Sequence, residues 1–564
     1  MINTMLTTLS YPDIRRFYAE GHWADDTLYD LVLKGAASHP DHVALQDSRR
    51  TVTYRQLLVA VNELADDLDR NGVRTGQRVA VWLSSRLETV VAILACSRNG
   101  LICSPSLHRN HTAEETLQLM SRMSAAALIG EAGYGANIEQ TDIYDRLDSV
   151  PSLKCAYRLS APDALDALAI HDLSGRDVLS GASAQTVPTE VGRRCGDANA
   201  VCYLAFTSGT TGEPKGVMHS SNTLLANARA MATDWSFDRE SVVYTLSPLS
   251  HNLGFGAMVL ALAVGARLVV HDLGRGKSLL QRLIEVGATF AFGVPVHASD
   301  LLKELEQAGE AKGLRLVGFR ISGAAAPRAL VKSLLGYGIR PQSGYGMTEG
   351  CSHHYTLPDD SPDRVINTSG RACPGYEVRI VSQDDPERVL PAGEVGQIVA
   401  RGASLMLGYF DDQLSTERSY SPSGWFMTGD LGFLDAEGYI TITGRKKDII
   451  IRGGHNIFPA RIESLAHQYP GLERVAAIPV PDERLGEKVC LVVMARSQKP
   501  IDANEVLAHL YHAGLSKFDM PEYFLQVDEI PLTASGKILK RAVVDAVNAG
   551  RWSPIPVRWS GPQP

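Results

Sequence analysis

The chain has 564 residues, which is too long for one compact core, so we expect two or more domains. Hydrophobic residues make up 45% and charged residues 21%, as in soluble globular proteins, and the net charge of −8 gives no general attraction to nucleic acid or acidic membranes. The eight cysteines are scattered without a CxxC pair, which argues against a zinc site or a disulfide framework and fits a reducing cytoplasm. The sequence shows no secretory signal and no apolar stretch long enough to cross a bilayer, so we expect a cytoplasmic protein without a membrane span.

The first half of the chain alternates helical and strand-like patterns. From Thr53 onward, Leu57, Val61, Leu64 and Leu68 share one face of a helix. Residues 161–197 are polar and irregular, which indicates a surface excursion. Further elements are expected as strands at 78–83, 242–246, 267–271 and 289–292 and as a helix at 87–97. This alternation predicts an α/β fold with helix-covered, mostly parallel sheets.

The segment from Thr207 to Gly216, TSGTTGEPKG, is the most informative in the chain. Its glycines let the backbone approach a ligand closely, its hydroxyls donate to phosphate oxygens, and its lysine adds a compact positive charge. An apolar strand at 200–206 precedes the loop, and a helix is expected at 222–231. The spacing is not that of a Walker A loop. A plain surface loop is the competing interpretation, which this density of glycine and hydroxyl residues disfavours.

The pattern changes after about residue 375. Short strands at 376–381, 396–401 and 438–443 between turns predict a small barrel-like subdomain. From Asp448 onward we expect a compact α+β domain, followed by a loosely ordered proline-rich tail at 552–564. The expected order of this domain is a strand, a helix from Pro459, strands near Val475 and Val489, a helix from Asn504 and a strand near Tyr523.

Six further segments carry residues suited to nucleotide chemistry. They are 248–252, 322–327, 345–349, 425–430, 444–457 and 531–537. Each alone has an ordinary structural explanation, such as a turn, a solvated charged loop or a surface lysine. Together with the glycine-rich loop, and in this order along the chain, the segments indicate a nucleotide site far more specifically than any one of them does alone.

From about Trp23 to Val547 the sequence resembles the adenylate-forming superfamily, which includes acyl-CoA synthetases, adenylation domains and luciferases. The resemblance implies a large N-terminal domain at 1–446, with the barrel-like subdomain at 375–446, and a small mobile α+β domain at 447–564 with its hinge at Lys447. It also implies two half-reactions. ATP and a carboxylate give an acyl-adenylate and pyrophosphate, and a thiol then displaces AMP.

The resemblance assigns ATP- and AMP-binding roles to residues in both halves of the chain. The glycine-rich loop would hold the β- and γ-phosphates, small residues at 323–325 would lie against adenine, and Asp430, with Arg445 nearby, would bind the ribose. The full set is Thr207, Ser208, Gly209, Thr210, Thr211, Gly212, Lys215, Gly323, Ala324, Ala325, Tyr345, Gly346, Met347, Thr348, Asp430 and Arg445.

The same resemblance implies the catalytic residues. Thr348 would contact the α-phosphate, and Glu349 would bind Mg²⁺ through its carboxylate. Lys537 would bridge the carboxylate and the α-phosphate, which is electrostatic catalysis. His251 would stand between the acid pocket and the thiol channel as a gate rather than a general base.

Two pockets complete the expected site. The acid pocket would be lined by His251, Asn252, Phe255, Gly323 and Gly346, and the coenzyme A tunnel by Gly453, Gly454 and His455. The expected partners are ATP, a carboxylic acid and either CoA or an acyl carrier protein, with the chain a monomer or a homodimer.

The sequence resembles two groups of enzymes that differ in their acid and thiol substrates. One group is the CoA ligases of cyclic or medium-chain carboxylates, and the other is the aryl-acid ligases that load a carrier protein. Asn252 follows His251 as in aryl-acid ligases that load a carrier protein, whereas Leu253, Gly254 and Ala257 favour a roomier, apolar pocket for a cyclic acid. The GGHNIFP segment at 453–459 looks more like free-CoA ligases, which we favour. A non-catalytic nucleotide-binding homologue is less favoured, because Lys537, Glu349 and Asp430 are all present. A light-emitting monooxygenase on the same scaffold is a further alternative, which an assay of acyl-CoA formation against oxygen uptake would separate.

Overall fold

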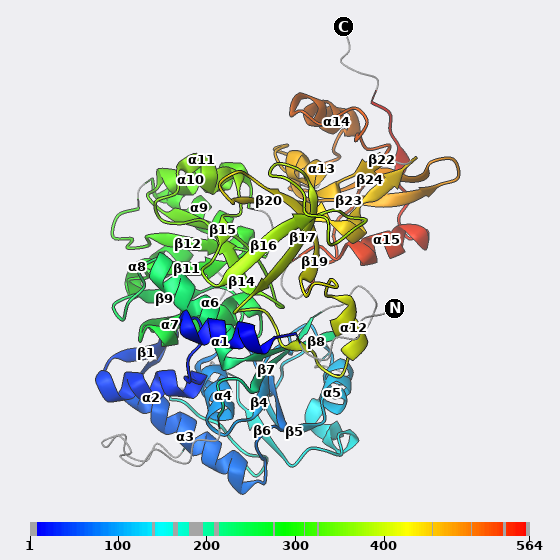
Figure 1. The fold of residues 1–564 in the computed structure, drawn as a ribbon. Coiled ribbons are helices and arrows are strands. Elements are labelled where there is room, and N and C mark those ends of the chain that lie inside the picture. The colour runs from blue at the N-terminus through cyan, green and yellow to red at the C-terminus, as the bar shows by residue number, and fades with distance from the viewer. Residues whose placement is uncertain are drawn as a thin grey trace. The chain divides into compact units, whose positions relative to one another are not determined.

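The computed structural model describes residues 8–137, 141–161, 167–179, 196–207, 214–273, 277–309, 311–323, 326–453, 455–497, 499–533 and 537–559. Contacts divide the chain into two compact units (Figure 1). Unit 1 comprises 1–377 and 401–420, and unit 2 comprises 378–400 and 421–564. In the described part of the chain, no helix combines the length and the apolar character that crossing a membrane requires.

Unit 1 contains a nine-stranded sheet in the order β15-β14-β13-β12-β11-β9-β10-β1-β2. The strands from β13 to β1 run parallel, and β14, β15 and β2 are antiparallel additions at the edges. The bounds are β1 Val43–Gln46, β2 Thr51–Thr53, β9 Val242–Thr245, β10 Arg267–Val270, β11 Phe290–Gly293, β12 Gly318–Ile321, β13 Arg340–Met347, β14 Cys351–Tyr355 and β15 Arg371–Ala372.

A seven-stranded sheet, also in unit 1, has the order β18-β8-β7-β4-β3-β5-β6. Its strands from β7 to β6 are parallel, whereas β8 and β18 are added antiparallel beyond β7. The bounds are β3 Arg78–Trp82, β4 Ile102–Ser104, β5 Ala125–Glu131, β6 Cys155–Leu159, β7 Val201–Thr207, β8 Lys215–Ser220 and β18 Gly408–Tyr409. The sequence predicted β7 but not β8 or β18.

The helices of unit 1 begin where the sequence provides caps. In α3, Thr53 and Gln56 form a capping box, and the predicted face of Leu57, Val61, Leu64 and Leu68 is fully buried. The bounds are α1 Tyr11–Ala19, α2 Leu28–Ser38, α3 Tyr54–Arg70, α4 Leu87–Arg98, α5 Ala113–Arg122, η1 Ile143–Ser149, α6 Ser221–Asp234, α7 Asn252–Ala263, α8 Leu279–Val286, α9 Pro295–Ala308, α10 Arg328–Gly336, α11 Pro362–Asn367 and α12 Gln413–Arg418.

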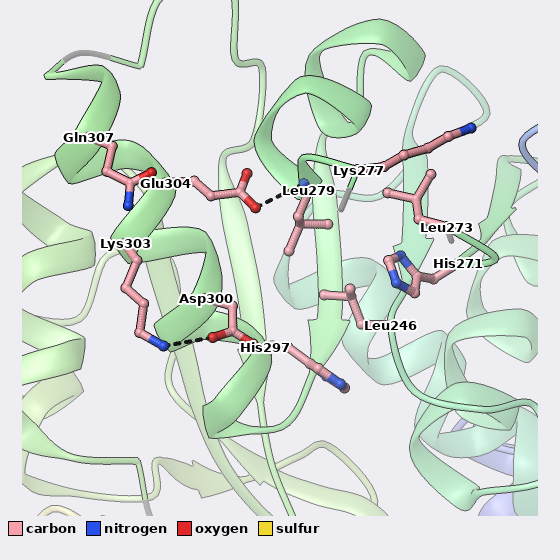
Figure 2. A pocket seen from close by; sticks show the side chains of 10 residues that line it. All are labelled: Leu246, His271, Leu273, Lys277, Leu279, His297, Asp300, Lys303, Glu304 and Gln307. Atoms are coloured by element: carbon pink, nitrogen blue, oxygen red, sulfur yellow. Dashed lines mark hydrogen bonds and ion pairs between the residues drawn. The ribbon is translucent and has the colours of Figure 1, made fainter. Parts of the chain in front are cut away.

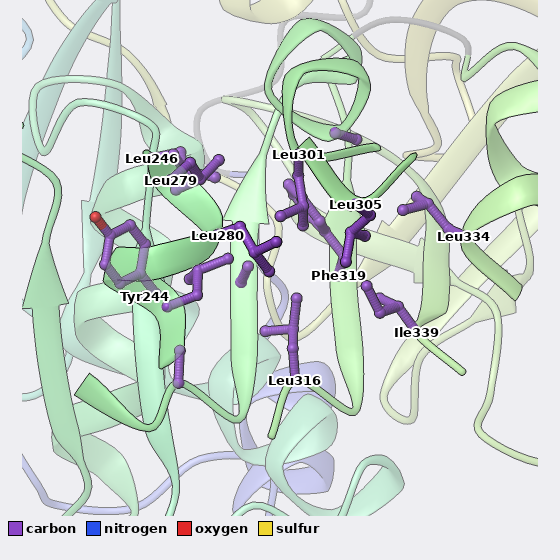
Figure 3. Packing of buried hydrophobic residues seen from close by; sticks show 14 of the residues in the cluster. Tyr244, Leu246, Leu279, Leu280, Leu301, Leu305, Leu316, Phe319, Leu334 and Ile339 are labelled. Carbon is purple, nitrogen blue, oxygen red and sulfur yellow. The ribbon is translucent and has the colours of Figure 1, made fainter. Parts of the chain in front are cut away.

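The nine-stranded sheet is held by a close-packed apolar core. Leucines of α8, α9 and α10 pack against Phe319 of β12 and Tyr244 of β9, with Leu301, Leu305 and Leu334 fully buried (Figure 3). This packing keeps the carboxyl ends of the parallel strands together. Ligands of open α/β sheets bind at such ends.

The remaining strands form two smaller sheets, whose residues belong to unit 2 except for Tyr376 and Glu377 of β16 and Arg401 and Gly402 of β17. The first has the order β16-β17-β19-β20, and the second has the order β22-β21-β24-β25-β26 with β23 paired to β24. The strands are β16 Tyr376–Val381, β17 Gly396–Gly402, β19 Phe426–Leu434, β20 Ile440–Arg445, β21 Ile450–Arg452, β22 His455–Ile457, β23 Leu472–Asp482, β24 Gly486–Ala495, β25 Tyr523–Gln526 and β26 Ile555–Pro556, with helices η3 Lys446–Asp448, α13 Pro459–Ala466, α14 Ala503–His512 and α15 Lys540–Asn548.

The mixed α/β fold and the element order after residue 448 confirm the sequence prediction. The expectation of a loose tail is wrong for Ile555 and Pro556, which form β26 against β25. Contacts group 421–446 with the residues that follow. The domain boundary at 446/447 and the hinge at Lys447 stay predictions.

Candidate active site

The ends of the glycine-rich loop meet where the β7–β8 hairpin is closed by that loop. Thr207 pairs with Lys215, and the Thr207 hydroxyl donates to the Lys215 carbonyl oxygen at 3.4 Å. Ser208, Gly209, Thr210, Thr211 and Gly212 lie outside the described residues. The antiparallel strands therefore fix both ends of the predicted phosphate loop.

The Thr348-Glu349 segment accepts hydrogen bonds from two buried side chains. Nε2 of His219, a fully buried residue of β8, lies 2.7 Å from the Thr348 carbonyl oxygen, and burial lowers the pKa of His219 to about 4. The imidazole is therefore neutral at pH 7, and Nε2 donates because a carbonyl oxygen can only accept. On the other side, the hydroxyl of Tyr409 donates to Glu349 Oε1 at 2.9 Å.

The turn between β13 and β14 requires small or strained residues. A Cβ at Gly346 would collide with the Cys351 carbonyl oxygen, and Cys351 itself has φ of +59°. Non-glycine residues with a positive φ are uncommon and concentrate at functional sites. Beside the turn, the ring centroids of Tyr345 and His353 lie 4.9 Å apart, with the rings edge to face. Gly323 follows β12 with φ of +91°, and Ala324 and Ala325 lie outside the described residues.

The predicted acid-pocket residues lie at the start of α7. His251 is the N-cap: its Nδ1 accepts from the Leu253 backbone N–H at 3.3 Å. The side chain of Asn252 donates to the Met347 carbonyl oxygen at 3.5 Å, and Phe255 is buried with its ring 4.3 Å from that of Tyr203. These contacts join α7 to β13 and to β7.

Gly254 does not support the argument for a roomy pocket. A Cβ at this position would collide with the backbone carbonyl oxygens of Ser247 and Pro248. Glycine is therefore needed for the loop to approach the helix closely. Leu253 and Ala257 are both buried.

The candidate residues of unit 2 lie within strand β19, at the end of β20 and in the segments around β21, β22 and Lys537. Asp430 of β19 pairs with Arg445 of β20, and Arg445 Nε lies 3.1 Å from Asp430 Oδ1. Lys447 lies in the short helix η3 and is exposed. The neighbouring Lys446 donates to the Gln383 carbonyl oxygen at 2.6 Å, which anchors the chain just before Lys447.

The predicted thiol loop is the tight turn between β21 and β22. Gly453 has φ of +56°, and its N–H donates to the Leu485 carbonyl oxygen at 2.7 Å. His455 Nε2 lies 2.7 Å from Asp519 Oδ1, and Gly454 lies outside the described residues. Lys537 closes a second turn, because its backbone N–H donates to Thr533 Oγ1 at 3.1 Å.

Among the described residues of unit 1, Thr207 contacts Lys215, Asn252 contacts Met347, and Tyr409 contacts both Lys215 and Glu349. The structure also identifies two residues that the sequence did not suggest: His219, behind Thr348, and Tyr409, whose ring centroid lies 4.5 Å from Lys215 Nζ. No local pattern could have found them, because both act through partners far away along the chain. The candidate residues of unit 2 form separate pairs and turns within that unit.

A cavity of about 430 Å³ lies elsewhere in unit 1, near the carboxyl ends of β9, β10 and β11 (Figure 2). Several of its polar groups already have partners. Lys303 Nζ lies 2.9 Å from Asp300 Oδ1, and Glu304 accepts from the backbone N–H of Leu279. Its lining, which includes Leu246, His271 and His297, contains none of the sequence-predicted site residues.

Comparison with known proteins identifies the family. Residues 33–410 match the AMP-binding enzymes, and residues 461–537 match the AMP-binding enzyme C-terminal domain. The medium-chain fatty-acid–CoA ligase of Escherichia coli (strain K12) is 32% identical over 545 residues, covering 95% of this chain and 94% of that protein. A salicylyl-CoA synthase / salicylate adenylyltransferase of a Streptomyces species is 29% identical over 539 residues, covering 94% and 96%.

Among solved structures, ATP-bound MatB from Rhodopseudomonas palustris has a TM-score of 0.77 at 27% identity, covering 92% of this chain and 98% of that one. The two sequence relatives and this solved structure each match more than nine-tenths of the chain. The chain therefore belongs to the AMP-binding enzyme family and is an AMP-forming acid–thiol ligase.

Proposed function

We propose that the protein is a carboxylate–CoA ligase that activates a hydrophobic, cyclic carboxylic acid with ATP and transfers the acyl group to the thiol of CoA. The proposal that the protein binds ATP rests on the position of Tyr409, which contacts both Lys215 and Glu349. A cation and a carboxylate are thus held beside the two ends of a glycine-rich loop. This combination suits a polyphosphate bound with a divalent cation.

In the first half-reaction, a carboxylate oxygen attacks the α-phosphorus and pyrophosphate leaves. The O–P bond to the acid forms while the bond between the α-phosphorus and the bridging oxygen breaks. Lys215 and the loop from Thr207 bind the β- and γ-phosphates, and Thr348 contacts the α-phosphate. Lys537 neutralises the charge that accumulates at the α-phosphate in the transition state.

The remaining nucleotide contacts follow from residue chemistry. Small residues at 323–325 leave room for a flat adenine ring. Asp430 accepts hydrogen bonds from the ribose hydroxyls, because a carboxylate has several lone pairs and its Arg445 partner holds it in position.

The residues fit Mg²⁺ rather than a cation held only by the protein. The described residues contain no group of three or more His, Cys, Asp or Glu side chains arranged to hold a metal ion. Mg²⁺ commonly binds through one or two carboxylates together with substrate phosphates and waters, which is what Glu349 beside a phosphate loop provides. Such an ion would neutralise phosphate charge, while Tyr409 keeps the Glu349 carboxylate in place.

In the second half-reaction, the thiol sulfur attacks the acyl carbon. The C–S bond forms, the C–O bond to AMP breaks, and the thiol proton goes to solvent. His251 serves as a gate. Its Nδ1 accepts from Leu253, so the neutral ring carries its proton on Nε2 and has no lone pair there to act as a base. Gly453, Gly454 and His455 line the path of the thiol arm.

The choice of acid and thiol rests on resemblance and relatives. The medium-chain fatty-acid–CoA ligase and the salicylyl-CoA synthase both have CoA in their names, which supports free CoA as the acceptor. Asn252 favours the second candidate, an aryl-acid ligase that loads a carrier protein, because its amide could meet a ring hydroxyl. Its donation to the Met347 carbonyl oxygen at 3.5 Å is a long contact that such a substrate could replace.

A substrate panel tests the proposal. Aliphatic, alicyclic and aromatic acids, with and without an ortho hydroxyl, are each incubated with enzyme, ATP and Mg²⁺ while pyrophosphate release is measured. CoA and a phosphopantetheinylated carrier protein are then compared as acceptors by mass spectrometry. We expect cyclic acids and free CoA to give the highest kcat/KM. Preference for an ortho-hydroxy aryl acid together with the carrier would establish the second candidate instead.

A further inference from the structure

Tyr409 lies between two residues that the proposed function assigns to phosphate and metal binding. It belongs to the two-residue strand β18, in which Gly408 pairs with Met218 and Tyr409 with Val217 of β8. The backbone N–H groups of Leu407 and Phe410 donate to the carbonyl oxygens of Met218, at 2.8 Å, and Gly216, at 2.6 Å. This short strand therefore has a fixed register on the edge of the β7–β8 hairpin.

The phenol hydroxyl contacts the candidate metal ligand. Tyr409 is 6% exposed, and its hydroxyl donates to Glu349 Oε1 at 2.9 Å. The Glu349 backbone is bound by the same segment, because the Met406 N–H donates to the Glu349 carbonyl oxygen at 2.7 Å. Both the main chain and the side chain of Glu349 are therefore held by residues 406–409. An ionised carboxylate has several lone pairs, so it can accept this bond and also bind a cation.

The ring of Tyr409 contacts the phosphate-loop lysine. Lys215 Nζ lies 4.5 Å from the ring centroid, within the range of a cation–π contact. Lys215 is also the first residue of β8, the strand on which β18 is paired. One side chain thus touches the cation through its face and the carboxylate through its hydroxyl.

We propose that Tyr409 is a positioning residue for the nucleotide: its hydroxyl sets the orientation of the Glu349 carboxylate toward a divalent cation, and its ring sets the position of Lys215 toward phosphate. This inference rests on the proposed function of Lys215 and Glu349. The two parts of the side chain have separate effects. Loss of the hydroxyl weakens metal binding alone, whereas loss of the ring also weakens ATP binding without metal.

Direct binding measurements separate these effects from catalysis. Mn²⁺ serves as a spectroscopic substitute for Mg²⁺, and its binding to the enzyme–ATP complex is measured by electron paramagnetic resonance. ATP binding in the presence of a chelator is measured by calorimetry. The variants are Tyr409→Phe and Tyr409→Leu. The matched control is Tyr355→Phe, because Tyr355 is also buried in unit 1 and its hydroxyl donates to the Asp234 carboxylate at 2.8 Å, outside the candidate site.

We expect Tyr409→Phe to weaken Mn²⁺ binding by about tenfold, as is typical when a residue that orients a metal ligand is removed. Metal-free ATP binding should be unchanged in Tyr409→Phe and weakened in Tyr409→Leu. Tyr355→Phe should lose a similar amount of stability in urea while both affinities stay at the wild-type value. Wild-type Mn²⁺ affinity in folded Tyr409→Phe would overturn the inference.

Glu349→Gln distinguishes this inference from the function on which it rests. If Glu349→Gln weakens Mn²⁺ binding and Tyr409→Phe does not, the positioning role is wrong and the metal role of Glu349 is retained. If neither variant changes Mn²⁺ binding, the metal role assigned to Glu349 is wrong, and the positioning role falls with it.

Discussion

The candidate residues of unit 1 and unit 2 are held in different ways. In unit 1, Thr348 and Glu349 are bound by His219, which is fully buried, and by Tyr409, which is 6% exposed. In unit 2, the side chains of Arg445 and His455 are 50% and 51% exposed, whereas the side chains of their partners Asp430 and Asp519 are 8% and 18% exposed.

This difference has an energetic consequence. Polar contacts of exposed side chains contribute about 0–1 kcal/mol, so Arg445 and His455 can exchange partners at little cost. Buried hydrogen-bonded groups are costly to separate, so the residues of unit 1 keep one arrangement. We propose on this basis that unit 1 holds the nucleotide and that exposed residues of unit 2 change partners between steps.

Of the substitutions considered, Lys537→Ala should have the largest effect on a reaction rate, and it tests whether units 1 and 2 have different roles. Loss of one charge aligned with the α-phosphate should reduce adenylate formation by about 10²–10³-fold or more. Conversion of a supplied acyl-adenylate to thioester should continue at a substantial rate, because the nucleotide residues of unit 1 are intact. Pyrophosphate release and single-turnover thioester formation are measured separately. An equal loss in both steps would show that Lys537 serves folding or another role.

Gly454→Leu should separate the half-reactions in the opposite direction. The leucine side chain would occupy the thiol path beside Gly453, so thioester formation should stop while pyrophosphate release from ATP and acid stays nearly normal. Quenched-flow measurement of bound acyl-adenylate, followed by addition of CoA, tests this. If thioester forms at the wild-type rate, the thiol path lies elsewhere.

Gly346→Ala tests the rigidity of unit 1. The added methyl group would collide with the Cys351 carbonyl oxygen, and overpacking of this kind costs about 1–3 kcal/mol. The free energy of unfolding is measured in urea.

Gly256→Ala is the control for this substitution. Gly256 lies in α7 and a Cβ there would meet nothing within 4 Å, so the change should be neutral or stabilise the helix by up to about 1 kcal/mol. If Gly346→Ala is as stable as the control, the β13–β14 turn is more adaptable than its packing indicates.

Acid should weaken unit 1 more than unit 2. Burial lowers the pKa of His219 and His297 to about 4, and of His108 and His354 to about 3, and all four belong to unit 1. In unit 2, burial also lowers the pKa of His467. Histidines of the unfolded chain have a pKa of about 6.5, so between about pH 6.5 and 4 the unfolded state binds more protons than the folded state.

Stability is therefore fully present above about pH 6.5 and is lost as the pH falls, by up to about 1.4 kcal/mol per histidine and pH unit. Hydrogen exchange followed by mass spectrometry at pH 7 and pH 5 would resolve the two units. Peptides of unit 1 should lose protection first, and His219→Gln should reduce that loss. Equal loss in both units would contradict this expectation.

The sequence predicted the elements whose signals are local. Helix α3 followed from its apolar spacing, and strands β3 and β9 from short apolar runs between helices. Strand β18 was missed because it has only two residues and forms by pairing with β8, far away along the chain, and β8 was missed because its sequence KGVMHS has no longer apolar run. Long-range pairing of this kind has no periodic signature.

The candidate site shows the same limit. The motifs around Thr348, Asp430 and Lys537 could be recognised because each is a compact segment with a defined order in the chain. Tyr409 and His219 could not, because a single tyrosine or histidine in a strand has no distinguishing pattern. Gly254 was misinterpreted for a related reason: sequence alone does not tell a glycine that lines a pocket from one that allows close backbone packing.

Lys447→Pro tests most directly the central claim that unit 2 supplies Lys537 to the first step and the Gly453 turn to the second. We propose that the change between these steps occurs at Lys447, where Lys446 is anchored to Gln383 and the exposed Lys447 is the next residue. Proline fixes φ near −65° and restricts the preceding residue as well. The measurement is the single-turnover rate of each half-reaction in the purified variant. The account predicts normal acyl-adenylate formation and failed thioester formation, whereas thioester formation at the wild-type rate would contradict it.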